Sequence, residues 1–540
     1  MNNSEEKVIP TEQYNAESLE TIKRLSAENA ILQSRLDELT GKYNFLLEKY
    51  LLKVKKLFGR AREAIDGQTV LEGFFNEAEV ESDTTQPDPD IEEAIGPMLR
   101  QAKKYIGQKK AKLDGLPVER VDYDIPEEER ICDNCGSPLP ELKPEIRSRI
   151  EVIPAQIKVI EEVRHVYADC NKCKKDDQDD AVIIKAPIPQ SAIPHSIATE
   201  ATIAFVITDK YQFGLPLYRQ EAQWRMLDMR ISRQTMSNWI ILATDSWLKL
   251  IYDRLHWHLI KRDIIMADES SLQVLHEKDR PATSTSYMWL YCSGRDGPPI
   301  ILFNYQQTRE TKHPEKFLSG FSGYLCTDGY AAYYRLPSVI NVSCFSHARR
   351  YFYDAFMLLP KTARNKTSAA FIGLNYCNKL FDVERDIRQM SYQDRYEERQ
   401  LKSQPILNEF KQWLDMMRPS AENKSHLGKA VNYCLNYWET LCNYMLDGRL
   451  DIDNNKSERQ IKGYVIGRKG WLFSNTPNGA NASAIAYSIV HTAIENRLKP
   501  FEYIQYLLKS LPNSDVKDQA VLDSFLPWSD SIPDSCRLKK

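Results

Sequence analysis

Apolar side chains recur at heptad spacing near the start of the chain. The two repeating positions hold Ile22, Leu25, Asn29, Leu32, Leu36, Leu39, Tyr43 and Leu46. This spacing predicts a coiled coil, which we place at residues 17–62 together with the basic end of its helix. Asn29 in the apolar seam favours a parallel dimer in register, because two facing Asn side chains can hydrogen-bond each other. The alternative is an amphipathic helix that packs on its own domain.

Two later stretches have the period of helices. Residues 190–260 are predicted to form a helical domain, with one helix in LPLYRQEAQWRMLDM and a second that begins after Ser232, a typical N-cap residue. Such a helix pair is typical of a DNA-binding helix-turn-helix, although pairs of this kind occur in any helical domain. Residues 359–450 are predicted to be a second helical segment.

Between residues 261 and 358 the pattern changes to short apolar runs, which predict strands separated by turns and short helices. Five strands are predicted. The first ends at Asp268 and the fourth ends at Asp328, whereas the second, third and fifth cover residues 286–292, 299–306 and 339–345. Short helices are expected at 315–321, after Gly329 and in SHARRYFYDAF. This order suits a ribonuclease H-like domain, in which the first and fourth strands are neighbours.

Acidic residues at the ends of neighbouring strands suit a metal ion. Asp268 and Asp328 would come within reach of one Mg²⁺, which prefers oxygen ligands. A third carboxylate is available in Glu458, in the first turn of a helix that begins at Asn454 or Asn455. Three carboxylates would complete a two-metal site for in-line phosphoryl displacement. Taken singly, each acid would be an ordinary surface residue.

Basic residues follow the fifth predicted strand, and others follow Glu458 on its helix. We expect these residues to contact DNA phosphates, with ordinary helix packing as the alternative. They are His347, Arg349, Arg350, Arg459, Lys462, Arg468 and Lys469.

Two Cys-x2-Cys pairs predict a zinc ribbon at residues 129–180. The ligands would be Cys132, Cys135, Cys170 and Cys173. Four thiolates close a tetrahedral shell, so this Zn²⁺ would be structural. Two strands are expected between the pairs, the second around Val159, Ile160 and Val163. The alternative is two disulfides, and the other seven cysteines show no paired spacing and are expected to be ordinary buried thiols.

Overall charge conceals strong local differences. The 540 residues contain 72 Lys and Arg against 75 Asp and Glu, a net charge of −3. Residues 72–128 are predicted to be a linker whose acidic first part, 72–93, offsets basic stretches at 53–62 and 100–112. The basic stretches could contact DNA or be solvated. No apolar run reaches membrane-spanning length and no signal pattern is visible, so we expect a cytoplasmic protein without a membrane partner.

Long motifs of this chain, in order along its length, resemble those of the transposase of the insertion-sequence 66 family, a bacterial DDE transposase. The motifs include GLPVERVDYDIPEEERICDNCGSPL, YQFGLPLYRQE, ISRQTMSNWI, ADESSLQVL, FSGYLCTDGYAAY, CFSHARRYF, GRLDIDNNKSERQIKGYVIGRKGWLF and LPWSD. The chain departs slightly from the family's usual residues near Phe345 and Gly463, and neither difference affects one of the three carboxylates.

The resemblance implies a multidomain α/β fold, with a ribonuclease H-like catalytic core at 261–358 and 451–500, a helical insertion and a C-terminal segment at 501–540. It implies a DNA transposase that cleaves at element ends and joins the freed 3′-hydroxyls to target DNA. Asp268, Asp328 and Glu458 would be the catalytic residues and would hold Mg²⁺ or Mn²⁺. The partners would be DNA, a second copy of the chain and small accessory proteins of the element, at the bacterial nucleoid.

Two other functions remain open. A metal nuclease that hydrolyses DNA without joining it would use the same carboxylates. A catalytically silent or domesticated DNA-binding protein would use the coiled coil and the zinc ribbon, but retention of all three acids argues against it.

Overall fold

The computed structural model describes residues 156–168, 183–420, 422 and 424–539, together with a few residues between 23 and 35. The predicted linker and all four cysteines of the predicted zinc ribbon lie outside the described residues. Most of the predicted coiled coil does too, although Lys23–Ser26 are helical and Leu25 is 55% exposed. Residues 157–540 belong to one compact unit, which contains the sheet and the helices around it.

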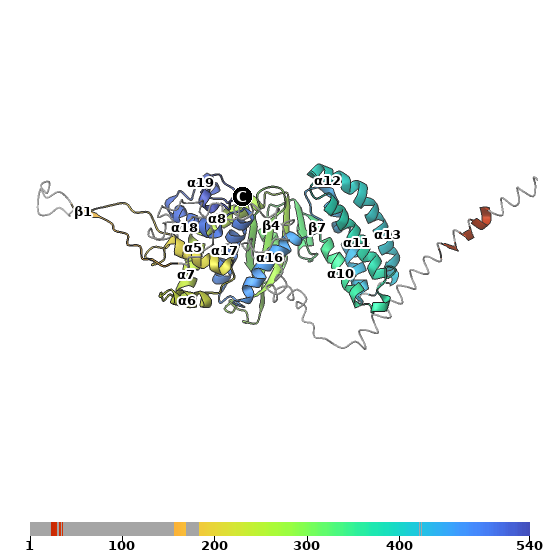
Figure 1. Cartoon of the computed structure of the whole chain (residues 1–540), viewed down its shortest axis with the longest axis horizontal. Helices are drawn as coiled ribbons and strands as arrows, with labels where there is room; N and C mark the ends of the chain where they lie inside the picture. Colours follow the sequence, from red (N-terminus) through yellow and green to blue (C-terminus); the bar gives the residue numbers. More distant parts are fainter. Residues whose placement is uncertain are drawn as a thin grey trace, which may run out of the picture. The chain divides into compact units, whose positions relative to one another are not determined.

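A five-stranded mixed sheet forms the centre of this unit (Figure 1). Its strands are β3 (Ile264–Gln273), β4 (Thr285–Ser293), β5 (Ile301–Gln306), β6 (Tyr324–Thr327) and β7 (Ile340–Ser343). Their order across the sheet is β5-β4-β3-β6-β7. β3, β4 and β5 pair antiparallel as a meander, whereas β6 and β7 run parallel to β3. The predicted first and fourth strands are therefore neighbours.

One strand boundary was predicted wrongly. β3 does not end at Asp268 but continues to Gln273, where it is still paired with Thr285 of β4. The continuation is polar and half exposed, so it lacks the apolar run that signals a strand. Only pairing with β4 keeps it extended.

Two short helices also differ from their predictions. The helix expected at 315–321 is α9 (Lys312–Phe317), which ends before Gly320 adopts a φ of 88°. The segment after Gly329 forms only a single 3₁₀ turn, Tyr333–Arg335. Gly329 has a φ of 101°, a conformation that favours glycine and suits a turn rather than a helix start.

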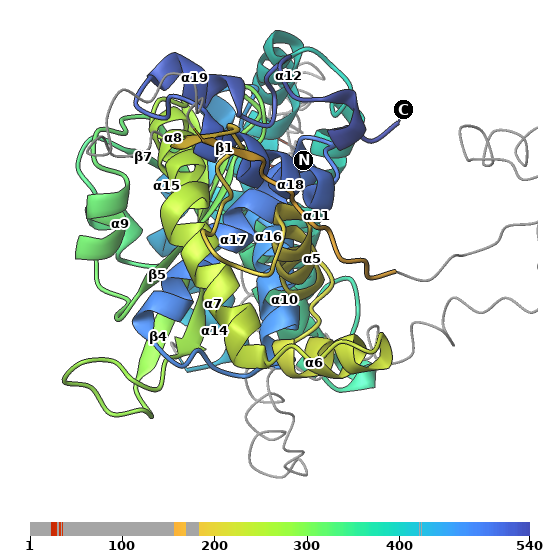
Figure 2. The same cartoon turned by 90° about the vertical axis from the view of Figure 1, so that its left-hand side faces the viewer.

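One set of helices is built around α8 (Lys249–Leu259) and α17 (Pro477–Glu495), which contact β5. Its other members are α5 (Glu200–Tyr211), α6 (Leu217–Met226), α7 (Arg233–Ala243), α18 (Pro500–Ser510) and α19 (Gln519–Ser524). The predicted cap of α7 is confirmed, since the Ser232 side chain accepts a hydrogen bond from the Thr235 amide. A π-helical turn joins α7 directly to α8, and Figure 2 shows the two as one long rod.

A second set of helices follows β7. It consists of α10 (Phe345–Leu358), α11 (Ala369–Asp386), α12 (Tyr392–Glu398), α13 (Gln404–Met417), α14 (His426–Asn436) and α15 (Trp438–Cys442). α10 packs on α11 and α14, so the helix that leaves the sheet belongs to the same bundle as the inserted helices (Figure 1). The chain then returns to the sheet through α16 (Asn455–Lys469), which contacts β3 and β4.

A hairpin near the predicted zinc ribbon also differs from its prediction. Residues 156–165 have no regular structure, so the strand expected around Val159 and Val163 was wrong. The strand is instead β1 (Val166–Ala168), and it pairs with β2 (Ile183–Lys185). A strand requires a partner for its backbone, and the partner lies beyond the second cysteine pair, where no strand was expected.

Edge strand β5 is covered by side chains of α17. The Thr492 hydroxyl accepts a hydrogen bond from the Ile301 amide at 3.0 Å and donates one to the Ile301 carbonyl at 2.9 Å. The Ser488 hydroxyl likewise accepts from the Phe303 amide at 2.7 Å. Buried backbone groups of an edge strand cannot reach water, so these hydroxyls replace the missing neighbouring strand.

We predict that Thr492→Val destabilises the protein by about 1–3 kcal/mol, although Val has the same shape as Thr. The change leaves the Ile301 amide and carbonyl buried without partners. Chemical denaturation would measure the loss. Thr362→Val, at an exposed site on a 3₁₀ turn, is the control and should have little effect; equal losses in the two variants would contradict the role of Thr492.

Candidate active site

Asp268 and Asp328 come from adjacent parallel strands at equivalent positions. Met266 of β3 is the register partner of Cys326 of β6, and each aspartate follows two residues later. Since side chains alternate along a strand, the two carboxylates point to the same face of the sheet. Asp328 directly follows the end of β6, as predicted.

Both aspartates are oriented by backbone amides. One carboxylate oxygen of Asp268, Oδ1, accepts a hydrogen bond from the Glu269 amide at 2.8 Å. Oδ1 of Asp328 accepts from the Tyr330 amide at 3.1 Å, which closes a tight turn at the end of the strand. In each residue the other oxygen, Oδ2, is not used by these contacts.

Glu458 is brought to the aspartates by the first residues of α16. The Asn454 side chain does not cap its own helix; its Nδ2 donates to the carbonyl of Ala267 at 2.9 Å, beside Asp268. The Asn454 amide donates to Sγ of Cys344, at the end of β7, at 3.2 Å. These two bonds attach the helix start to two strands, and Glu458 follows in the first turn. Its predicted place near a helix start is confirmed.

The three acids interact electrostatically. Burial, together with the negative charges of Glu269, Asp328 and Glu458, raises the pKa of Asp268 well above its ordinary value. One oxygen of Glu458, Oε1, is buried without a hydrogen-bond partner. Buried carboxylates that repel one another are stabilised by a cation, so this donor set fits a hard divalent ion such as Mg²⁺ or Mn²⁺.

Glu269, which the sequence patterns did not single out, supports the site from the opposite face of β3. Its side chain is 2% exposed, and its carboxylate pairs with Arg309 and accepts a hydrogen bond from the Tyr333 hydroxyl at 2.6 Å. The Arg309 guanidinium lies 3.7 Å from the ring centre of Tyr330, whose amide holds Asp328. A chain of contacts therefore links β3 to the turn that carries Asp328. Two consecutive acids in ADESS were the only sequence signal for this role.

The three basic residues predicted on α10 separate into two groups. Nδ1 of His347 lies 3.9 Å from Oε1 of Glu458, and Arg350 lies 3.8 Å from the other oxygen of Glu458, Oε2. Arg349 instead donates from Nε to the Asn378 side chain on α11 at 2.7 Å. Burial lowers the pKa of His347, opposed by the charges of Glu458 and Asp328. His347 and Arg350 therefore border the acids, and Arg349 does not.

The remaining predicted bases lie along α16. Arg459, Lys462 and Lys469 are exposed, whereas Arg468 is half-buried and its guanidinium lies 3.5 Å from the Ser271 hydroxyl on β3. The exposed three share one side of the helix, because their spacing follows the helical repeat.

The seven cysteines of the described region are free, and the prediction of buried thiols is confirmed for six of them, whereas Cys442 is only half-buried. Among these, Cys344 borders the candidate site through its bond to the Asn454 amide. Within the described residues, the metal-ligating groups that all lie within 4.8 Å of one another belong to Cys344, His347 and Glu458 rather than to the three acids.

The chain belongs to the transposase IS66 family. The model of that family matches residues 195–482, a range that includes Asp268, Asp328 and Glu458. The model described as the zinc-finger binding domain of transposase IS66 matches residues 129–174, which include the four paired cysteines. The family resemblance inferred from the sequence motifs is thereby confirmed.

Three relatives from Sinorhizobium fredii (strain NBRC 101917 / NGR234) are similar over most of their length. The chain is 27% identical to uncharacterized protein y4hP, covering 77% of this chain and 75% of the relative. It is 27% identical to uncharacterized protein y4jD, covering 76% and 80%, and 26% identical to uncharacterized protein y4qI, covering 87% and 85%. Among the described residues, no helix is long and apolar enough to cross a membrane.

We predict that Asp268→Asn raises the melting temperature at pH 8 without divalent ions by a few degrees. The raised pKa means that the native state holds the Asp268 proton more tightly than the unfolded chain does. Ionised Asp268 therefore costs stability at high pH, and the cost disappears as the pH falls through the raised pKa. Thermal melts of both proteins across a pH series would show the gap narrowing toward low pH.

Asp253→Asn, at an exposed position of α8, is the control and should change little at any pH. Added Mg²⁺ should stabilise the wild type more than Asp268→Asn. A gap between wild type and Asp268→Asn that does not change with pH would contradict the proposed repulsion.

Proposed function

We propose that this transposase cleaves DNA at the ends of an insertion sequence and joins the freed 3′-hydroxyls to target DNA. Asp268, Asp328 and Glu458 are the catalytic residues of this proposal and hold Mg²⁺ or Mn²⁺. The observation that carries it is that Asp268 and Asp328 occupy equivalent positions of paired parallel strands and that Asp268 interacts electrostatically with both Asp328 and Glu458. The strand order β5-β4-β3-β6-β7, with one antiparallel meander and two parallel additions, supports a ribonuclease H-like core.

Each protein group has a distinct part in this proposal. Bound divalent ions would activate the attacking oxygen and stabilise the leaving oxygen of in-line phosphoryl transfer. The carboxylates hold the ions, and the Glu269–Arg309 pair keeps the two strands that carry Asp268 and Asp328 in place. Arg350 carries a positive charge at the edge of the acids, where a phosphate would approach.

The exposed side of α16 is the proposed contact for DNA near the active site. Arg459, Lys462 and Lys469 extend from the same helix as Glu458, so a strand bound there would lie beside the acids. His347 and Arg468 border the same region, whereas Arg349 is engaged by Asn378. The pair α6 and α7 is a second candidate, since Arg233 at the start of α7 is exposed.

The rest of the chain serves assembly and DNA capture in this proposal. Zn²⁺ held by the paired cysteines stabilises the zinc-finger domain, and the heptad segment pairs two copies of the chain. Small accessory proteins of the element complete the assembly at the bacterial nucleoid.

The central test is cleavage and joining with DNA that carries the ends of the host element. We expect both activities in Mg²⁺, and we expect Asp268→Asn to lose them by about 10³-fold or more while DNA binding is retained. Asp328→Asn and Glu458→Gln should behave alike, because the acids act as a unit. Asp253→Asn is the control and should remain active.

Pre-cut ends distinguish the other two functions. Hydrolysis without joining would indicate a metal nuclease and would contradict the transposition chemistry. DNA binding with neither activity would indicate a catalytically silent DNA-binding protein. Joining that survives in Asp268→Asn would show that the assigned acids are wrong.

We predict that Lys462→Gln weakens DNA binding about equally for all sequences and reduces the salt dependence of binding by about one ion. The reason is the loss of one phosphate contact on α16. Binding measured at several salt concentrations would show the smaller slope. Lys509→Gln, an equally exposed change on α18, should leave the slope unchanged; equal effects of the two changes would place the DNA elsewhere.

A further inference from the structure

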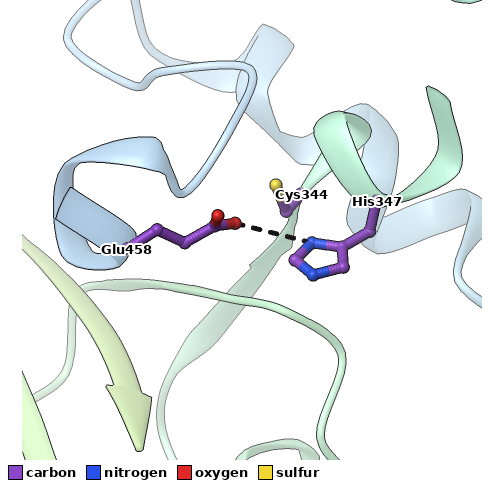
Figure 3. Close-up of side chains that lie close together, drawn as sticks. All are labelled: Cys344, His347 and Glu458. Atoms are coloured by element: carbon purple, nitrogen blue, oxygen red, sulfur yellow. Dashed lines mark ion pairs between the residues drawn. The ribbon is translucent and has the colours of Figure 1, made fainter. Parts of the chain in front are cut away.

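Three chemically different metal ligands meet beside the acids. The Cys344 thiol, the His347 imidazole and the Glu458 carboxylate each offer a ligand atom, and these atoms all lie within 4.8 Å of one another. Figure 3 shows His347 and Glu458 facing each other, with the sulfur of Cys344 beside them. Cys344 directly follows β7 and is the N-cap residue of α10, His347 lies in the first turn of α10 and Glu458 lies in the first turn of α16.

Two of these ligands have unused bonding capacity inside the protein. Nδ1 of His347 and Oε1 of Glu458 are both buried without a hydrogen-bond partner. Their separation of 3.9 Å is too long for a hydrogen bond. Buried polar atoms are ordinarily satisfied, so these two facing atoms lack a partner that a shared bound ion would supply.

Burial raises the pKa of the Cys344 thiol to about 12, and hydrogen bonds from the backbone amides of Asn454 and His347, at the starts of α16 and α10, oppose that rise. A cation bound at the sulfur would supply the further stabilisation that the thiolate needs. Amides at helix starts favour negative charge on the atom they face. His347 lies three positions after Cys344, a spacing that places both side chains on one side of the α10 start.

We propose that Cys344, His347 and Glu458 form a binding site for Zn²⁺. This site differs from the hard-cation site of the three acids, but the two sites have Glu458 in common. A thiolate and an imidazole select Zn²⁺ over Mg²⁺, which prefers oxygen ligands alone. Three protein ligands leave the fourth tetrahedral position for water. Binding displaces the thiol proton of Cys344 to solvent, and Arg350, which is 58% exposed, can move away from Glu458.

Occupation of this site inhibits the enzyme. A Glu458 carboxylate bound to Zn²⁺ is withdrawn from Asp268 and Asp328, so the hard-cation site loses its third ligand. This consequence rests on the proposed function of the acids, whereas the binding of Zn²⁺ itself does not.

The first test counts zinc in the full-length chain. Wild type and Cys344→Ser are equilibrated with Zn²⁺ in excess Mg²⁺, separated from free metal and analysed for bound zinc. Both proteins keep the four paired cysteines, so the difference isolates the new site. We expect wild type to hold about one more zinc ion per chain. His347→Asn should lose the same ion, and Cys377→Ser, which changes a buried thiol on α11, should keep it.

Replacement of the added ion by Co²⁺ identifies its ligands. A thiolate-to-cobalt absorption band should be stronger in wild type and Cys377→Ser than in Cys344→Ser. Equal zinc content and equal absorption in wild type and Cys344→Ser would overturn the proposal. Zinc content and absorption equal to wild type in His347→Asn would show that His347 is not a ligand. Circular dichroism checks that each variant is folded.

The second test measures inhibition of Mg²⁺-dependent DNA cleavage by Zn²⁺, each protein being compared with its own rate without added zinc. Wild type and Cys377→Ser should be inhibited at concentrations at least about tenfold lower than Cys344→Ser. Equal inhibition would show that Zn²⁺ acts at the acids themselves and would overturn the inhibitory role. Absence of cleavage in Mg²⁺ would contradict the proposed function, while the zinc count would still decide whether the site exists.

Discussion

The arrangement of the candidate active site depends on the attachment of α16 to the sheet through Asn454. Its side chain bonds the Ala267 carbonyl of β3, and its amide bonds the sulfur of Cys344 at the end of β7. An Asn at this position would ordinarily cap its own helix. Here Asn454 makes no capping bond, and its side chain and amide attach the helix start to β3 and to the residue after β7 instead. Glu458 reaches the aspartates because of this exchange, although more than a hundred residues separate it from Asp328.

The same region concentrates negative charge that the protein only partly neutralises. Burial raises the pKa of both Glu269 and Asp268, but Arg309 opposes the rise at Glu269 on one face of β3, whereas no described residue supplies a comparable cation to Asp268 on the other face. These two consecutive residues therefore differ in the cation that accompanies them, and the acid without one is the candidate metal ligand. A fold selected for stability alone would not keep repelling carboxylates together, so the uncompensated face is the one on which an ion and a phosphate are expected to bind.

Much of the fold could be predicted from local patterns. Apolar runs indicated the strands around Asp268 and Asp328, and Ser232 marked the start of α7 because its chemistry is that of an N-cap. The patterns failed where pairing decides the structure. β3 continues past Asp268 through polar residues because β4 is beside it, and the strand near the predicted zinc ribbon lies at Val166, where its partner β2 can reach it.

By itself, the sequence determined the family, the element types and the identity of the three candidate acids, since these depend on residue type and spacing along the chain. Only the tertiary structure decided which side chains share a site. It brought His347, Arg350 and Cys344 to Glu458, turned Arg349 toward α11 and assigned Glu269 to support the sheet. The physical reason is that these relations arise from strand register and from hydrogen bonds between distant segments, which local periodicity does not encode.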